Sequence, residues 1–245
     1  MKAMILAAGE GTRLRPLTLK TPKVMLPIAG KPILEYTLDL LRFHGITDAA
    51  INLHHLPNVV IDWLGDGSRL GVRVTYSMED PILGTAGALT RLRGFFDDTF
   101  ILIYSDVLTD LDISSLVRFH QAKKALATVA LFEVDNPSAC GIVEMDDECQ
   151  IVRFVEKPAP GITSSNLANA GIYVLEPSMI DHIPLDTFYD FGFHLFPALL
   201  DKGARLCGYV TGGYVIDTGT MENYRRAERD VLGGRFVPKR AASTR

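Results

Sequence analysis

The 245-residue sequence has few cysteines, one tryptophan and no long hydrophobic run. Cys140, Cys149 and Cys207 follow neither the spacing of a zinc site nor that of a redox pair, and scattered cysteines in odd number are typical of a reducing compartment. We therefore interpret them as small buried residues. The apolar run at residues 4–8 is too short for a signal-peptide core, and no run could span a membrane. The sequence thus predicts a cytoplasmic protein without a membrane partner.

An excess of positive charge and a metal-binding histidine pattern are also missing. The formal net charge is −4, so nothing indicates a surface for nucleic acid. His54 and His55 are adjacent and would face opposite sides of a strand. Hydrophobic residues make up 47% of the chain, enough for a sizeable core. Because no linker is visible, we predict one catalytic domain over residues 1–233, followed by a flexible basic tail over 234–245.

Short apolar runs alternate with helical patterns through the first half of the chain. The patterns predict strands at 3–8, 49–53, 72–77, 100–104 and 128–134, and helices from 32 to 44 and at 59–64, 85–92 and 113–123. Later segments are predicted as a hairpin of 142–145 with 151–155, a strand at 169–175, a helix at 188–200, short strands at 205–210 and 214–216, and a helix at 221–232. Strands alternating with helices predict an α/β fold with a Rossmann-like mixed, mostly parallel sheet flanked by helices.

A long loop over residues 9–30 follows the first predicted strand and is rich in Gly, Pro, Thr, Lys and Arg. Its glycines let the backbone approach a phosphate, and Arg13 and Lys23 would add positive charge around a triphosphate. The dinucleotide glycine motif fails at Leu14, and the P-loop motif is absent. The plain alternative is a flexible basic loop. We favour a nucleotide-binding loop, because several phosphate-suited features share one loop after a strand.

Six segments in order along about 210 residues carry a resemblance to a known family. They are Leu6 to Pro16 with Pro22-Lys23, Gly84-Thr85-Ala86-Gly87-Ala88-Leu89, Ser105-Asp106, Glu156-Lys157-Pro158, Asn169 to Tyr173, and Asp217-Thr218-Gly219. Together they resemble the signatures of the sugar-1-phosphate nucleotidylyltransferases, and the second segment is similar to the mannose-1-phosphate guanylyltransferase branch. Full-length members often carry a C-terminal β-helix, which we do not expect in this chain.

The resemblance implies a role for each matched residue. Arg13, Lys23 and Asp106 would be catalytic, and Asp106 and Asp217 would bind Mg²⁺ or another divalent cation, which prefers carboxylate oxygens. Sugar-phosphate contacts would come from Gly141, Glu156, Lys157 and Asn169. The nucleotide would be bound by Leu6, Ala8, Gly9, Gly11, Thr12, Arg13, Glu79, Gly84 and Thr85.

Each of these residues has a plainer interpretation when taken alone. An aspartate after a strand is commonly a turn or cap residue, and Glu156-Lys157 could be a solvated charge pair. Ser105 stands where the family usually has glycine, so its hydroxyl could disturb the metal site or bond nearby. Glu79 stands where related enzymes commonly place a base-reading glutamine. An ionised glutamate only accepts hydrogen bonds, which favours guanine, although Glu79 could equally be an exposed turn residue.

The implied function is transfer of a nucleoside monophosphate from a nucleoside triphosphate to a sugar 1-phosphate, with GTP and mannose 1-phosphate favoured. UTP, dTTP or CTP with glucose, N-acetylmuramate or heptose 1-phosphate, or with phosphocholine, stays open. An alternative from another class is a non-catalytic sensor of nucleotide sugars that acts as a regulatory subunit. A hydrolase is disfavoured, because the chain has no nucleophile elbow. A homo-oligomer is compatible with the sequence.

Overall fold

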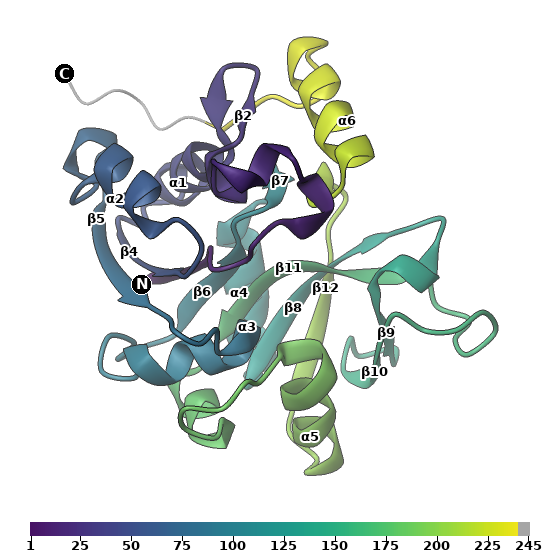
Figure 1. Ribbon diagram of the computed structural model, residues 1–245. Helices are drawn as coiled ribbons and strands as arrows, with labels where there is room; N and C mark the ends of the chain where they lie inside the picture. The colour runs from purple at the N-terminus through teal and green to yellow at the C-terminus, as the bar shows by residue number, and fades with distance from the viewer. Residues whose placement is uncertain (240–245) are drawn as a thin grey trace. The chain divides into compact units, whose positions relative to one another are not determined.

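The computed structural model, whose helices and strands are labelled in Figure 1, describes residues 1–239. These residues group into two compact units. The first unit contains residues 1–82, 103–113 and 213–239, and the second contains residues 83–102 and 114–212. Each unit is therefore built from segments that are separated in the sequence. A helix long and hydrophobic enough to cross a lipid bilayer is not found among these residues.

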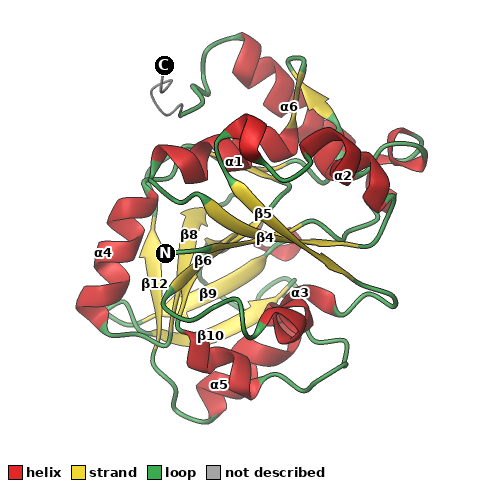
Figure 2. Ribbon diagram, turned by 90° about the vertical axis from the view of Figure 1, so that its left-hand side faces the viewer, coloured by secondary structure: helices red, strands yellow, loops and turns green. Residues whose placement is uncertain are grey.

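The first unit contains a parallel sheet in which β1 pairs with β4 and β4 with β5. Its strands and helices are β1 (Ala3–Leu6), β2 (Pro27–Ile28), β3 (Lys31–Pro32), α1 (Ile33–Phe43), β4 (Asp48–Leu53), α2 (Pro57–Leu64), β5 (Arg73–Met78), β7 (Val107–Thr109), β13 (Val215–Asp217) and α6 (Met221–Leu232). Helices α1 and α2 lie beside β4 and β5 (Figure 2). In the sheet Leu6 is opposite Asn52, and Leu53 is opposite Met78. The carboxyl ends of the three strands therefore meet at one edge, where α/β sheets bind their ligands.

Two short antiparallel pairs complete the first unit. Strands β2 and β3 form a hairpin at the end of the long loop, which also contains the 3₁₀ turns η1 (Thr12–Leu14), η2 (Leu17–Leu19) and η3 (Lys23–Met25). Strand β7 pairs with β13, so that Val107 lies opposite Asp217. The loop is thus folded locally, and the alternative of a flexible loop does not describe it.

The second unit has a mixed arrangement around β8. Strand β8 (Ala127–Glu133) is antiparallel to β11 (Leu167–Leu175) and parallel to β12 (Leu206–Val210), while β9 (Gly141–Met145) forms an antiparallel pair with β10 (Ile151–Glu156). Its helices are α3 (Gly84–Gly87), α4 (Ile113–Lys123) and α5 (Phe196–Asp201). Phe119 of α4 packs on Tyr209 of β12, and Phe196 of α5 packs on Phe154 and Tyr173. Strand β6 (Phe100–Tyr104) has residues in both units.

These elements confirm the predicted α/β class, a mixed sheet flanked by helices, with local differences. The helix predicted at 188–200 begins later, as a π-helical turn at Phe191–Leu195 that continues into α5. The tail predicted from residue 234 onward does not begin as free chain. Phe236 is 2% exposed, and its backbone N–H donates to the carbonyl of Asp230 at 3.0 Å, so this part belongs to the folded unit. Residues 240–245 of the predicted tail lie outside the described residues.

Candidate functional site

The loop after β1 is closed on itself at a glycine. Gly11 has a φ of +64°, and the Thr18 hydroxyl donates to its carbonyl at 2.8 Å. A Cβ at Gly11 would lie 2.8 Å from Thr18 Cγ2, so only glycine fits both the backbone angle and the space. Gly9, Thr12 and Arg13 are exposed around this turn, where their backbone and side chains can meet a ligand.

Asp106 and Asp217 lie side by side although they are more than a hundred residues apart in the sequence. The pairing of β7 with β13 brings the two segments together. The N–H and the hydroxyl of Thr218 both donate to the carbonyl of Asp106, at 2.9 and 2.8 Å. The backbone on which the two carboxylates stand is therefore fixed from both strands.

Two cations accompany these carboxylates. Lys23 Nζ forms a hydrogen-bonded ion pair with Asp106 Oδ2, with 14% and 16% of the two side chains exposed. The Arg13 guanidinium lies against Gly219, because a Cβ there would be 2.8 Å from Arg13 Nη2 and 2.7 Å from Asp217 Oδ1. The structure thus brings together four of the residues that the sequence analysis selected.

The surroundings of Asp217 raise the pKa of its carboxyl. Burial raises the pKa of its carboxyl, and the nearby charge of Asp106 raises it further. Lys23, Arg13 and the N–H of Gly219, which donates to Asp217 Oδ1 at 2.6 Å, oppose this rise. The site consequently favours additional positive charge beside Asp217.

This donor set fits a divalent cation of the magnesium type. Magnesium binds one or two carboxylates and completes its octahedral shell with water and substrate phosphate oxygens. Within residues 1–239, no group of three or more His, Cys, Asp or Glu side chains could hold a metal. Two neighbouring carboxylates, those of Asp106 and Asp217, match the ligands that magnesium takes from a protein.

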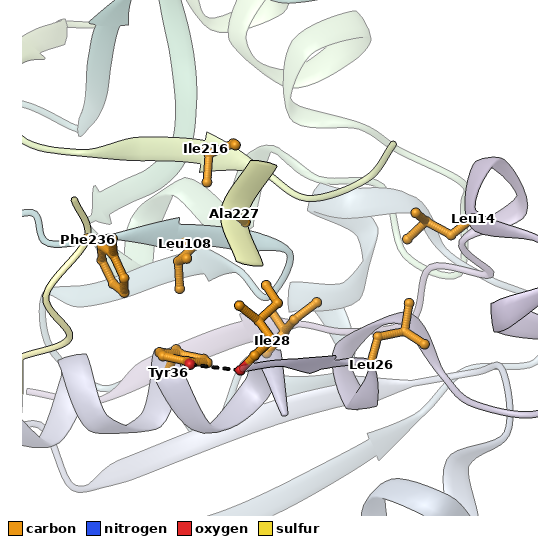
Figure 3. Packing of buried hydrophobic residues seen from close by; sticks show 9 residues of the cluster. Leu14, Leu26, Ile28, Tyr36, Leu108, Ile216, Ala227 and Phe236 are labelled. Carbon is orange, nitrogen blue, oxygen red and sulfur yellow. Dashed lines mark hydrogen bonds between the residues drawn. The ribbon is translucent and has the colours of Figure 1, made fainter. Parts of the chain in front are cut away.

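A hydrophobic cluster in the first unit supports these groups (Figure 3). Leu14 follows Arg13, Leu108 follows Asp106 by two residues, and Ile216 precedes Asp217. Figure 3 also shows Leu26, Ile28, Tyr36, Ala227 and Phe236 in the cluster, with the Tyr36 hydroxyl donating to the Ile28 carbonyl at 2.9 Å. Buried neighbours along the chain limit the movement of Arg13, Asp106 and Asp217, which preorganised charge requires.

Ser105 joins the aspartate segment to the end of β1. Its hydroxyl donates to the carbonyl of Leu6 at 2.5 Å, and its N–H donates to the same carbonyl at 3.1 Å. The side chain is therefore hydrogen-bonded within the fold, the second of the two outcomes considered for this departure from glycine. Ala8 is buried beside the same strand end.

Glu79 is not the exposed turn residue that the sequence left open. It is 2% exposed and lies directly after β5, at the edge where β1, β4 and β5 end. Asn52 Nδ2 donates to its Oε1 at 2.8 Å. Sequence reasoning missed Asn52, although a buried asparagine at the end of an apolar strand is a signal that could have identified it.

In the second unit, Gly84 and Thr85 are held by a segment that the sequence analysis did not select. Gly84 has a φ of +76°, and a Cβ there would lie 2.8 Å from the carbonyl oxygen of Tyr189. The N–H and hydroxyl of Thr85 both donate to Asp190 Oδ1, at 3.0 and 2.8 Å. Phe191 N–H in turn donates to the Thr85 hydroxyl at 3.0 Å. Asp190 thus fixes the start of the Gly84–Gly87 segment.

The predicted sugar-side residues also meet in the second unit. Glu156 lies opposite Gly141 in the β9–β10 pair. A Cβ at Gly141 or at Gly192 would lie 2.6 or 2.7 Å from Glu156 Oε2, so the carboxylate lies where two glycines leave space. Burial raises the pKa of Glu156; Lys157 opposes this rise, while the charge of Asp190 adds to it. Glu156 is therefore not a fully solvated charge.

Lys157 and Asn169 are placed by backbone geometry. Lys157 has a φ of +49°, and its N–H donates to the carbonyl of Cys140 at 2.9 Å. Asn169 lies where β11 has an irregular register, and its amide bonds the Tyr173 hydroxyl at 2.7 Å and the N–H of Gly171 at 2.9 Å. These contacts fix the Asn169 side chain at the β11 irregularity.

The sequence of the chain is similar to those of known proteins. Residues 2–233 match the family described as "Nucleotidyl transferase". The chain is 42% identical over 246 residues to a "UTP–glucose-1-phosphate uridylyltransferase" of Synechocystis sp. and 38% identical over 234 residues to a "Mannose-1-phosphate guanylyltransferase" of Mycobacterium tuberculosis. The matches cover 95% of this chain in both cases, but only 63% and 65% of the relatives.

Solved structures show the same fold. HddC from Yersinia pseudotuberculosis, complexed with GMP-PN, superposes with a TM-score of 0.80 at 26% identity. The superposition covers 94% of this chain and 99% of HddC. The chain spans less than two thirds of the two curated relatives, so the absence of a C-terminal β-helix stays a prediction.

Proposed function

Because this chain belongs to the nucleotidyl transferase family, we propose that it transfers a nucleoside monophosphate from a nucleoside triphosphate to a sugar 1-phosphate. The observation that carries the proposal is the convergence of Asp106, Asp217, Lys23 and Arg13 in the first unit. Two carboxylates with two cations suit a reaction in which an anionic nucleophile meets an anionic phosphate.

In this reaction a phosphate oxygen of the sugar 1-phosphate attacks the α-phosphorus of the triphosphate. The bond between the α-phosphorus and its bridging oxygen breaks, and pyrophosphate leaves. Such transfers depend on positioning and charge neutralisation more than on covalent help from the protein. A divalent cation held by Asp106 and Asp217 would supply part of that neutralisation.

The protein's own side chains would bind and orient the two substrates. Arg13, exposed beside Asp217, would bind the triphosphate, and Lys23 would neutralise the α-phosphate. In the second unit, Lys157 would bind the sugar phosphate, while Glu156 and Asn169 would contact sugar hydroxyls. The other loop residues would offer backbone N–H groups to phosphate oxygens.

We propose GTP and mannose 1-phosphate as the substrates. The support for GTP is Glu79, since an ionised carboxylate accepts hydrogen bonds from the paired donors of guanine and suits the mixed edge of uracil less well. One relative is named a guanylyltransferase for mannose 1-phosphate, whereas another is named a uridylyltransferase for glucose 1-phosphate. UTP with glucose 1-phosphate is therefore the second candidate pair.

A substrate panel tests the proposal. Purified protein with Mg²⁺ is incubated with GTP, UTP, dTTP or CTP and with mannose, glucose, N-acetylmuramate or heptose 1-phosphate or phosphocholine, while pyrophosphate release is followed. We expect the highest kcat/KM with GTP and mannose 1-phosphate. Turnover with CTP and phosphocholine alone would refute the substrate class. Tight binding of a nucleotide sugar without turnover in any mixture would favour a regulatory subunit instead.

The remaining sequence-based expectations concern location and partners. A cytoplasmic location and independence of nucleic acids and membranes stay predictions, as does the possibility of a homo-oligomer.

A further inference from the structure

Asn52 connects the start of the nucleotide loop with Glu79. The side chain is buried, with 2% of its surface exposed, and stands at the end of β4. Its Oδ1 accepts the N–H of Ala7 at 2.8 Å, and its Nδ2 donates to Glu79 Oε1 at 2.8 Å. Because a backbone N–H can only donate, the amide cannot be reversed, and its NH₂ group must face the carboxylate.

Glu79 is held at all three of its polar groups by three consecutive residues. Its N–H donates to the carbonyl of Leu53 at 2.9 Å, and its carboxylate accepts from Asn52. His54 Nδ1 bonds its carbonyl oxygen at 2.8 Å. A carbonyl only accepts, so Nδ1 carries the proton. The end of β4 therefore contacts Glu79 at its backbone and at its carboxylate.

The next residue holds the loop itself. His55 Nε2 bonds the carbonyl of Thr18 at 2.8 Å, and the Thr18 hydroxyl closes the turn on Gly11. The adjacent histidines thus serve two different segments. One fixes Glu79 and the other fixes the loop.

The position of Glu79 restricts what its charge can do. A buried carboxylate interacts strongly with its neighbours, so it would repel the triphosphate if it faced the phosphates. Facing the base, it favours an edge with adjacent donors and disfavours an edge with carbonyl oxygens. A wrong orientation of this group would therefore change the choice of base more than the chemistry.

We propose that Asn52 is a positioning residue that sets base selectivity by directing the Glu79 carboxylate. This inference rests on the proposed nucleotidyl transfer, because it assigns the selectivity of that same site. Asn52 touches neither the phosphates nor the metal ligands in this assignment. It acts through Glu79.

Asn52→Asp is the sharpest test, since the new carboxylate can still accept the N–H of Ala7 but cannot donate to Glu79. Two facing carboxylates repel, so the Glu79 carboxylate loses the direction that Asn52 gives it. We expect the ratio of kcat/KM for GTP to that for UTP to fall about tenfold or more, mainly through a higher KM for GTP. The KM for the sugar phosphate should stay within about twofold.

A double variant and a matched control separate positioning from stability. In Asn52→Asp with Glu79→Gln, the new amide can donate to Asp, so the melting temperature should recover while the GTP preference stays lost. Thr128→Val removes a different buried hydrogen bond, between the Thr128 hydroxyl and His120 at 2.9 Å in the second unit. It should lower the melting temperature without changing the nucleotide ratio.

The inference would be overturned if Asn52→Asp lowered kcat/KM for GTP and for UTP equally, in parallel with its melting temperature, and if the double variant restored both values. The substrate panel with the wild-type protein tests the proposed nucleotide independently of Asn52. If wild type prefers a nucleotide other than GTP, the proposed substrate is wrong. The role of Asn52 is then decided by whether Asn52→Asp reorders the nucleotides that wild type accepts, because an unchanged order refutes it.

Discussion

The two units position their candidate site residues in different ways. In the first unit, residues of opposite charge lie together: Lys23 pairs with Asp106, and the Arg13 guanidinium lies next to Asp217. In the second unit, the Glu156 carboxylate occupies space that is free because Gly141 and Gly192 have no side chains. The first arrangement depends on electrostatic balance, whereas the second depends on shape.

This difference suits the proposed ligands. Triphosphate and metal carry high charge, and preorganised opposite charges stabilise them strongly. The sugar ring of a sugar 1-phosphate is uncharged and is distinguished by the positions of its hydroxyl groups, which demands close fit. Removing a charge should therefore have its largest effect in the first unit. A methyl group added in the first unit should weaken use of the triphosphate, and one added in the second unit should weaken use of the sugar phosphate.

The largest effect is expected from Asp106→Asn, which removes one metal-binding charge at nearly constant shape. We expect kcat to fall by about 10²–10³-fold or more, because charge neutralisation at the transferred phosphate is lost. Pyrophosphate release measures the rate, and circular dichroism with the melting temperature checks the fold. Rates close to wild type in magnesium would remove Asp106 from the mechanism.

Asp48→Asn is the matched control for this change. Asp48 forms an exposed ion pair with Arg73 at 2.6 Å, and such pairs contribute about 1 kcal/mol or less to stability. Its kinetics should match those of wild type. A similar loss in both variants would show that the effect is not specific to the candidate metal site.

The charged residues of the first unit could be selected from sequence, but their convergence could not. Asp106 and Asp217 stand in segments that resemble family motifs, and this resemblance identified them. Their contact depends on strand β7, whose three residues are too short to show a strand pattern. Asn52, His54 and Asp190 were missed, because their importance comes from partners distant in the chain.

Helices with strong end signals were predicted well. The predicted 113–123 and 221–232 coincide with α4 and α6, and Thr220 caps α6 by accepting the N–H of Asn223 at 3.2 Å. Strand direction was harder. An apolar run such as β8 is buried whether its neighbours are parallel or antiparallel, so its pattern cannot distinguish β11 from β12.

Gly219→Ala tests the electrostatic arrangement with a methyl group. The new Cβ would lie 2.8 Å from Arg13 Nη2 and 2.7 Å from Asp217 Oδ1, so the guanidinium must move. We expect kcat/KM for the triphosphate to fall about 10- to 100-fold, the usual effect of a misplaced charged group near the chemistry. Gly212→Ala, which meets no atom within 4 Å, is the control and should behave like wild type.

Gly141→Ala applies the same change to the second unit. Its Cβ would lie 2.6 Å from Glu156 Oε2 and 3.0 Å from the nearest atom of the Phe154 ring, so the carboxylate must shift. We expect a KM for the sugar phosphate about tenfold higher, with the KM for the triphosphate changed less than twofold. Initial rates with each substrate varied in turn give both constants. Equal changes in both would contradict the separation of roles between the units.

The smallest effect concerns stability and separates shape from charge at Glu156. Burial raises the pKa of this carboxyl, so the folded protein holds the proton more tightly than the unfolded chain does. The stability gained from the protonated form is complete below the unfolded pKa of about 4.3 and is lost as the pH rises through the raised folded pKa. At neutral pH the ionised side chain therefore destabilises the fold.

Glu156→Gln keeps the shape and removes this charge. We expect the melting temperature to rise by about 1–3 °C at pH 7, a small shift because the half-buried carboxylate retains part of its hydration. Near pH 4 the difference should vanish, since wild type is then largely protonated. Thermal denaturation at both pH values measures the effect, with Glu133→Gln on the exposed end of β8 as the control. The same shift at both pH values would mean that shape, and not charge, governs the Glu156 position.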